Sequence, residues 1–127
     1  MSILNHACVG SNDRIKSAKF YDAALGALGV NNLGELGGVA TLYGIDTPDF
    51  IILTPMDGKP ATVANGATIG FKASTRDAVH KFHEAGLASG GTCEGAPGPR
   101  DFSPTAYASY LRDPDGHKIC AYCFAEE

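Results

Sequence analysis

His6, Cys8 and Cys120 are the residues of this sequence whose types suit chemistry at a metal ion. His6 and Cys8 are two positions apart, so they share one face of a strand, because side chains alternate along a strand. If Cys120 meets them, one imidazole and two thiolates form a nitrogen and sulfur donor set that suits zinc. The alternative, which we favour, is that His6 is a hydrogen-bonded pocket histidine and the two cysteines are small core residues.

The other histidines give weaker indications. His80 and His83 are three residues apart on an expected helix, so they share a surface, and such a pair can bind a metal. Without a third ligand, the pair is better interpreted as an exposed polar face. His117 follows a turn glycine and is expected to point away from Cys120, so we assign it no chemistry.

The four cysteines are interpreted as free thiols, most of them buried. Cys120 and Cys123 form a CxxC pattern, but residues three apart on a strand point to opposite faces. They are therefore not expected to share a metal or a disulfide bond.

Composition predicts one ordinary globular domain. The chain has 127 residues, of which 44% are hydrophobic and 19% charged, so there is enough apolar material for a core. A net charge of −4 argues against a nucleic-acid partner, because phosphate binding requires clustered Lys and Arg. The sequence shows no apolar stretch of membrane-spanning length, and residues 1–6 lack the pattern of a signal peptide, so we expect no membrane partner and a cytoplasmic location.

The first half of the chain predicts one helix among strands. A strand is followed by capping residues and an amphipathic helix that Gly29 ends. Three strands come next, with glycine and proline turns between them. The expected elements are a strand at 3–10, a helix at 14–28, and strands at 30–36, 38–43 and 50–54.

The second half repeats this order after a Gly- and Pro-containing linker at 55–66. We expect a strand at 67–73, a helix that follows capping residues 74–77 and ends near Ser89, and a loop-rich section at 92–104. A closing hairpin pairs 107–111 with 117–124. Its turn is Asp113-Pro114-Asp115-Gly116, where proline presets φ and glycine permits a left-handed exit.

The two halves can be overlaid. Phe20-Tyr21-Asp22-Ala23-Ala24-Leu25 matches Phe82-His83-Glu84-Ala85-Gly86-Leu87 at an offset of 82 − 20 = 62, which also takes His6 to Thr68. We therefore predict an α+β fold of two βαβββ modules, at about 1–56 and 66–127. Paired, their sheets form a curled eight-stranded mixed sheet, a cup able to hold a small molecule.

These landmarks resemble those of the vicinal oxygen chelate superfamily, which includes glyoxalases, bleomycin-resistance proteins and extradiol dioxygenases. The resemblance rests on Asn5-His6-Ala7-Cys8-Val9-Gly10, the two helices, the strand near Phe71 and the Asp113-Pro114-Asp115-Gly116 hairpin, in that order. It covers nearly the whole chain. The resemblance implies a cup-shaped fold of paired modules and a homodimer.

The resemblance also implies where a metal would lie. In such proteins the first and last strand of each module supply one His or carboxylate apiece, and the equivalent positions here are His6, Ile52, Thr68 and Cys120. A divalent ion needs two imidazoles with one or two carboxylates to keep positions open for a chelating substrate. This chain keeps His6 alone, so no metal or other cofactor is expected, and a divalent metal held by His6 and Cys120 stays the alternative. Asp49, the nearby carboxylate, is assigned to a solvated turn.

Without a metal, the implied cup is a pocket with a few polar groups. His6 can exchange a proton near neutral pH, and Thr68 can donate or accept a hydrogen bond. Arg100 lies at the expected rim, where it could pair with a ligand carboxylate or phosphate or instead with Asp101. Tyr107 and Tyr110 face opposite ways, and we favour Tyr110 as the pocket residue. Cys8, Ile52 and Cys120 complete the expected pocket.

Two functions follow from these residues. The one we prefer is a metal-independent protein that binds or sequesters a small ligand in the cup, similar to bleomycin-resistance proteins. The alternative is a metal-dependent lyase, isomerase or dioxygenase, similar to glyoxalases, that uses His6 and non-standard ligands to activate a substrate with adjacent oxygens. A third hypothesis is that the cup is a dimer scaffold that serves a neighbouring protein.

Overall fold

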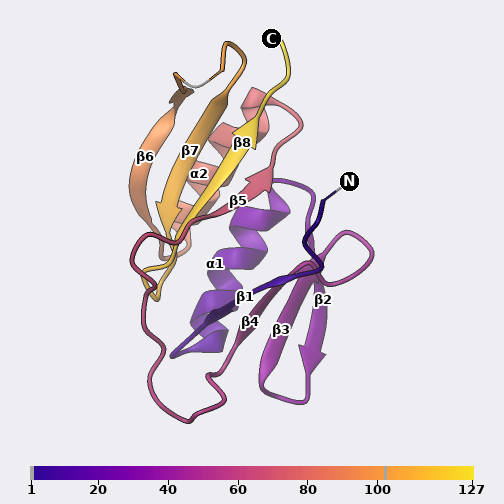
Figure 1. The fold of residues 1–127 in the computed structure, drawn as a ribbon, viewed down its shortest axis with the longest axis vertical. Coiled ribbons are helices and arrows are strands. Elements are labelled where there is room, and N and C mark those ends of the chain that lie inside the picture. Colours follow the sequence, from indigo (N-terminus) through magenta and orange to yellow (C-terminus); the bar gives the residue numbers. More distant parts are fainter. Residues whose placement is uncertain (1, 102) are drawn as a thin grey trace.

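The computed structural model describes residues 2–101 and 103–127 (Figure 1). Its helices and strands follow the predicted order of two βαβββ modules. In chain order they are β1 (Ala7–Gly10), α1 (Arg14–Gly26), β2 (Asn31–Leu36), β3 (Ala40–Gly44), β4 (Phe50–Leu53), β5 (Ile69–Lys72), α2 (Arg76–Ala88), β6 (Thr92–Pro99), β7 (Tyr107–Arg112) and β8 (Lys118–Cys123).

Both helices begin at a side-chain cap. The Asp13 carboxylate accepts a hydrogen bond from the Lys16 backbone N–H, and the Thr75 hydroxyl accepts one from the Ala78 N–H. Each cap satisfies a backbone donor that the first helical turn leaves unpaired. The capping residues expected from the sequence therefore set both helix starts.

The strands form two four-stranded sheets with the same topology. Sheet A has the order β1-β4-β3-β2 and sheet B the order β5-β8-β7-β6, with a parallel first pair in each. β1 and β5 begin at Ala7 and Ile69, an offset of 69 − 7 = 62, and α1 and α2 begin at Arg14 and Arg76, the same offset. The α+β fold of two βαβββ modules is confirmed.

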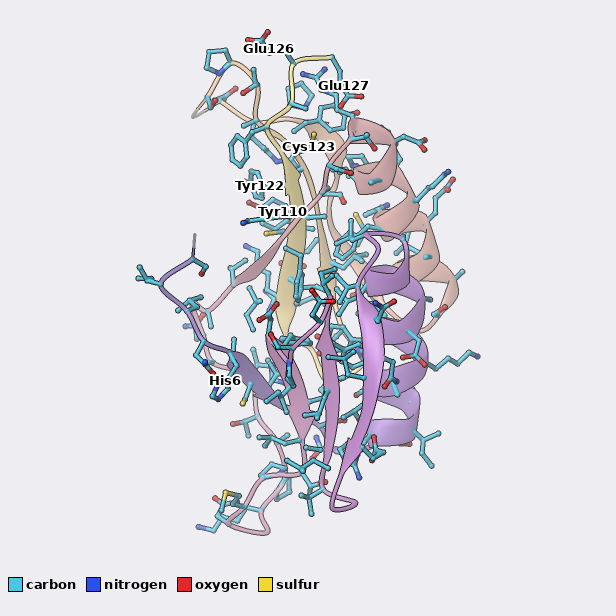
Figure 2. All side chains as sticks on the ribbon, turned by 90° about the vertical axis from the view of Figure 1, so that its right-hand side faces the viewer. His6, Tyr110, Tyr122, Cys123, Glu126 and Glu127 are labelled. Atoms are coloured by element: carbon cyan, nitrogen blue, oxygen red, sulfur yellow. The ribbon has the colours of Figure 1, made fainter. Side chains whose placement is uncertain are left out.

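The two sheets lie in one layer and both helices in another. Figure 2 shows the helices on one side of the sheets, and His6, Tyr110 and Tyr122 on the other side. Among the described residues no hydrogen-bonded strand pair joins sheet A to sheet B. The eight strands are therefore two sheets side by side, and within this chain they do not close into one continuous cup.

The core fills the space between the helix layer and the sheets. Phe20, Tyr21 and Leu25 of α1 and Phe82 of α2 are fully buried, together with residues of β4, β7 and β8. Gly86 of α2 allows close packing here, because a Cβ at this position would clash with Leu111 Cδ1. Any side chain there would have to displace Leu111.

The turn after β7 fastens the second module to the first. Gly116 has φ +96° and its N–H donates to the Asp113 carbonyl, so the predicted turn is present. The Asp113 carboxylate accepts a 2.6 Å hydrogen bond from the Tyr21 hydroxyl of α1, and the Asp115 carboxylate accepts one of 2.8 Å from Ser17. The landmark turn thus has a structural role at the junction of the modules.

Two predicted element boundaries need correction. Residues 92–104 were expected to form loop, but Thr92–Pro99 is strand β6. Its prolines are tolerated because β6 is an edge strand and its pairing with β7 shifts register around Gly95. The first strand begins at Ala7 instead of residue 3, so His6 lies just before it.

Candidate functional site

In the part of the chain that the structure describes, each sheet packs one face on the helices and has no helix or strand over its other face, which we call the open face. Residues directly opposite on neighbouring strands share a face, so the strand register assigns each side chain. On β8, Ile119, Ala121 and Cys123 are fully buried in the core. Lys118, Cys120 and Tyr122 alternate with them and lie on the open face of sheet B.

Tyr110 lies at the centre of the open face of sheet B. Its strand partner is Cys120, and its hydroxyl hydrogen-bonds the hydroxyl of Tyr122. Burial, and then the bond to Tyr122, raises the pKa of Tyr110, so the phenol stays protonated at neutral pH. Burial likewise raises the pKa of the Cys120 thiol to about 11. Both groups are therefore neutral hydrogen-bonding groups and not nucleophiles at neutral pH.

Two cations flank the Tyr110 ring. The Arg100 guanidinium carbon lies 5.4 Å and the Lys118 Nζ 5.2 Å from the ring centroid, distances at which a cation is attracted to an aromatic face. Arg100 donates to the carbonyls of Ala96, Gly98 and Pro99, which fix its position. In the described part of the chain neither cation has a carboxylate at ion-pair distance. We call these two cations with Tyr110, Cys120 and Tyr122 the Tyr110 cluster.

The Arg100 contacts bear on one of the two roles expected from the sequence, an ion pair with Asp101. Asp101 is exposed and forms no described ion pair with Arg100. Glu94, a carboxylate of the neighbouring strand β6, is paired with Arg112 at 3.1 Å. Among the described residues, Arg100 and Lys118 therefore form no ion pair beside the aromatic ring, although Lys118 is near enough to help lower the pKa of Glu94.

The open face of sheet A is apolar. Ile51 lies opposite Cys8 on one side and Leu42 on the other, and Leu53 lies opposite Gly10 and Ala40. None of these six residues carries a charge. Exposed Leu36, the strand partner of Ala40, extends the same surface.

His6 lies at the edge of the open face of sheet A. It is exposed, and its Nδ1 is 2.7 Å from the Asn5 Oδ1. A shallow concavity of about 480 Å³ surrounds it, lined also by Asp49 and Ile51. Figure 2 shows His6 well below Tyr110 and Tyr122, so within one chain His6 and the Tyr110 cluster are separate. The predicted pocket histidine is thus near the surface.

The structure places two predicted pocket residues on the helix side. Ile52 is fully buried in the core, and its neighbour Ile51 takes the open-face position. Ala7 pairs with Phe50 and Ile69 pairs with Ile119, which makes Phe50 the equivalent of Ile119 and Ile51 the equivalent of Cys120. The module offset on this strand is 119 − 50 = 69, one residue more than the sequence predicts.

Tyr107 also faces the helices. Its hydroxyl lies 2.7 Å from His80 Nε2, and the Arg76 guanidinium packs over its ring at 4.8 Å. Tyr110, three residues later, is on the open face, so the two tyrosines face opposite ways, as the strand periodicity predicted. Thr68 is exposed one residue before β5, and Cys8 is exposed within β1.

The four positions implied for metal ligands are therefore His6, Ile51, Thr68 and Cys120. Ile51 has no donor atom, Thr68 offers a neutral hydroxyl, and Cys120 resists ionisation. These residues do not fit a divalent cation that needs imidazole and carboxylate ligands. Among the described residues no group of three or more His, Cys, Asp or Glu is placed to hold a metal.

Sequence reasoning missed Lys118 and Tyr122. Both lie two positions from Cys120, so the two-residue period of a strand places all three on one face. This two-residue period can be read from the sequence, and it could have predicted that Lys118 and Tyr122 lie beside Cys120. His117, to which no chemistry was assigned, lies with its Nε2 2.7 Å from the Gly10 carbonyl oxygen and helps to join the modules.

The fold and the open-face geometry define a class of protein. Residues 3–121 match the Glyoxalase/Bleomycin resistance protein/Dioxygenase superfamily, and the chain belongs to this superfamily. It is similar to a glyoxalase/bleomycin resistance protein from Albidiferax ferrireducens T118, whose crystal structure aligns with a TM-score of 0.86 and 47% identity over 96% of this chain and 98% of that one.

More distant structures share the fold. A glyoxalase-related enzyme from Fulvimarina pelagi aligns with a TM-score of 0.75 at 16% identity, over 97% of this chain and 88% of that one. Glyoxalase I from Zea mays aligns with a TM-score of 0.73 at 16% identity, over 97% of this chain and 45% of that one. At these identities the likeness shows the fold alone. A comparison with curated protein sequences gave no match.

Neither helix of the described chain is both long and apolar enough to cross a membrane.

Proposed function

We propose that this protein binds a small anionic molecule at the Tyr110 cluster and is a binding or sequestering member of its superfamily. The observation that carries the proposal is the pair of cations, Arg100 and Lys118, beside the Tyr110 ring. Each lacks a described carboxylate partner in a chain whose net charge is −4. A carboxylate or phosphate ester would supply the missing negative charge.

The cluster also offers apolar and hydrogen-bonding contacts. Tyr122 stacks on Phe124 with ring centroids 5.6 Å apart, which extends the aromatic surface next to Tyr110. The Tyr110 and Tyr122 hydroxyls can donate or accept hydrogen bonds. A ligand that combines an anionic group with a flat unsaturated part fits these groups best.

A second chain would complete the pocket. Among the described strands no pairing closes sheet A on sheet B within one chain, so sheet A of the same chain does not form a wall opposite the Tyr110 cluster. The apolar open face of sheet A, extended by the exposed Leu36 and Val39, supplies such a wall in a homodimer. We propose this arrangement together with a cytoplasmic location.

The test is a thermal-shift screen with matched pairs of compounds. Aromatic carboxylates and phosphate esters are compared with their neutral amides and alcohols, since a ligand of the native state raises the melting temperature. Anionic members are expected to stabilise the protein and neutral members are not. Equal shifts for both members of each pair would contradict the proposal.

Substitutions then locate the binding site. Lys118→Ala and Arg100→Ala are each expected to weaken binding of a stabilising anion by about ten- to a hundredfold, because a charge-assisted hydrogen bond contributes about 1.5–3 kcal/mol. Lys59→Ala, in the exposed stretch between the modules, is the matched control and should keep the original affinity. If Lys59→Ala weakens binding as much as Lys118→Ala, the effect is one of net charge and not of this site.

The metal-dependent alternative has its own test. Protein purified without chelators is analysed for zinc, nickel, iron and manganese, in the wild type and in His6→Ala. Stoichiometric metal that is lost in His6→Ala would favour a lyase, isomerase or dioxygenase. Because the donor set around His6 does not fit such an ion, we expect the two proteins to have equal, substoichiometric metal content.

A further inference from the structure

Cys93 and His83 form a thiol and imidazole pair away from the open faces. Cys93 is on β6, an edge strand of sheet B. His83 is on α2, which packs on the side of sheet B opposite the open face (Figure 1). His83 Nε2 lies 3.2 Å from Cys93 Sγ. This distance is within hydrogen-bond reach for sulfur, so the thiol can donate to the ring nitrogen.

His83 is suited to accept the thiol proton. Only 9% of the residue is exposed. Burial first, and then the neighbouring His80, lowers the pKa of His83, while Glu84 opposes this change. The imidazole is therefore neutral at neutral pH, with a lone pair available to act as a base.

Cys93 combines this base with access to solvent, and no other described cysteine does. Cys120 and Cys123 are buried, and the Cys120 pKa of about 11 keeps it protonated. Cys8 is exposed like Cys93, but in the described structure it has no imidazole partner. Nucleophilic thiols in proteins are accessible and lie beside a basic group.

We propose that Cys93 and His83 form a reactive thiol site that is modified by small disulfides. The Cys93 proton passes to His83 Nε2 while the sulfur attacks one sulfur of the disulfide. A new S–S bond joins Cys93 to one half of the reagent, and the original S–S bond breaks. The other half leaves as a thiolate, which takes up the proton. The disulfide itself is the oxidant, so no further reactant is needed.

The direct test compares two cysteines in one native protein. The protein is treated with dithiodipyridine at neutral pH, and the modified fraction of each cysteine is followed by peptide mass spectrometry. Cys93 is expected to react about tenfold faster than Cys8, because His83 is placed to accept the thiol proton as the sulfur attacks. Equal rates at Cys93 and Cys8 would overturn the proposal, and no substitution is needed to see them.

Two histidine variants test the role of the base. His83→Gln should slow the reaction at Cys93 to about the rate at Cys8. His6→Gln is the matched control, because His6 is an exposed histidine of the first module and contacts Asn5 instead of Cys93. It should change the Cys93 rate by less than about twofold.

Buried Cys120 and Cys123 report whether each variant is folded, since they stay unmodified in the native state. A folded His83→Gln variant with an unchanged Cys93 rate would refute the role of His83. If His83→Gln does not fold, the wild-type comparison of Cys93 with Cys8 still decides.

Discussion

Ile51 of sheet A and Cys120 of sheet B occupy equivalent positions in the two modules, yet their neighbours differ in chemistry. Ile51 lies between Cys8 and Leu42, on a face without charge. Cys120 lies beside Tyr110, which Arg100 and Lys118 flank. The same backbone plan therefore carries an apolar surface in one module and a cationic, aromatic surface in the other.

On the sides that face the helices, by contrast, the two modules carry similar residues. Phe20 and Phe82 are equivalent at an offset of 62, and both are fully buried. Phe50 and Ile119, equivalent on the last strands, are also core residues. Packing against a helix demands apolar residues at every second position, whereas the open face is under no such demand. The comparison teaches that the two modules diverged where packing leaves side chains free.

The largest difference in stability is expected between substitutions of two adjacent residues of β4, one on the helix side and one on the open face. Ile52→Ala removes a fully buried side chain from the core and should lower the free energy of unfolding by about 3–4 kcal/mol. Ile51→Ala, one residue earlier on the half-buried open face, should cost about 1 kcal/mol. Urea unfolding of both variants measures the difference. Similar losses would contradict the register that places Ile52 against the helices and Ile51 on the open face.

The helices and strand β4 show which parts of the fold could be predicted from the sequence. The helices carry distinct aromatic patterns at Phe20-Tyr21 and Phe82-His83, so the offset of 62 and the two-module fold could be found without a structure. Phe50-Ile51-Ile52-Leu53 is apolar at every position, so alternation cannot show which residues face the helices. The one-residue difference in offset came from this uniform run.

The candidate site was only partly predictable for a related reason. Strand β6 contains Pro97 and Pro99, which favour loop in any local interpretation, and its pairing with β7 is a long-range feature. The position of Arg100 over Tyr110 depends on how this strand ends. Local sequence patterns do not show how one strand pairs with another, so contacts that depend on that pairing could not be predicted.

A smaller loss of stability is expected when a hydrogen bond between the modules is removed, and a still smaller loss when a hydrogen bond within one module is removed. Tyr21→Phe removes the hydroxyl that donates to the Asp113 carboxylate of the other module, which is 4% exposed. This leaves a buried carboxylate with fewer partners and should cost about 2 kcal/mol. Tyr43→Phe removes a bond to Asp22, an exposed carboxylate of the same module, and should cost about 1 kcal/mol or less.

Both values follow from chemical denaturation of the two variants beside the wild type. If Tyr43→Phe proves the more costly, the bond between the modules is not the stronger constraint. Loss of a single cooperative transition in Tyr21→Phe alone would sharpen the comparison, because it would show that this bond couples the unfolding of the modules.

The smallest effect concerns the pH dependence of the same junction. Burial raises the pKa of the Asp113 carboxyl above its ordinary value of 3.8, although hydrogen bonds from Tyr21 and the His117 backbone partly lower it. The folded state therefore holds this proton more tightly than the unfolded state. The resulting stability is fully present below pH 3.8 and is lost as the pH rises through the raised pKa.

Asp113→Asn removes this titration. The free energy of unfolding of the wild type minus that of Asp113→Asn should therefore decrease as the pH is raised from 3.8 toward neutrality. Asp77→Asn makes the same change in net charge on an exposed part of α2 and serves as the control. A difference that grows with pH for Asp113→Asn would mean that its hydrogen bonds outweigh its burial, so that the junction of the modules holds a charged carboxylate by preference.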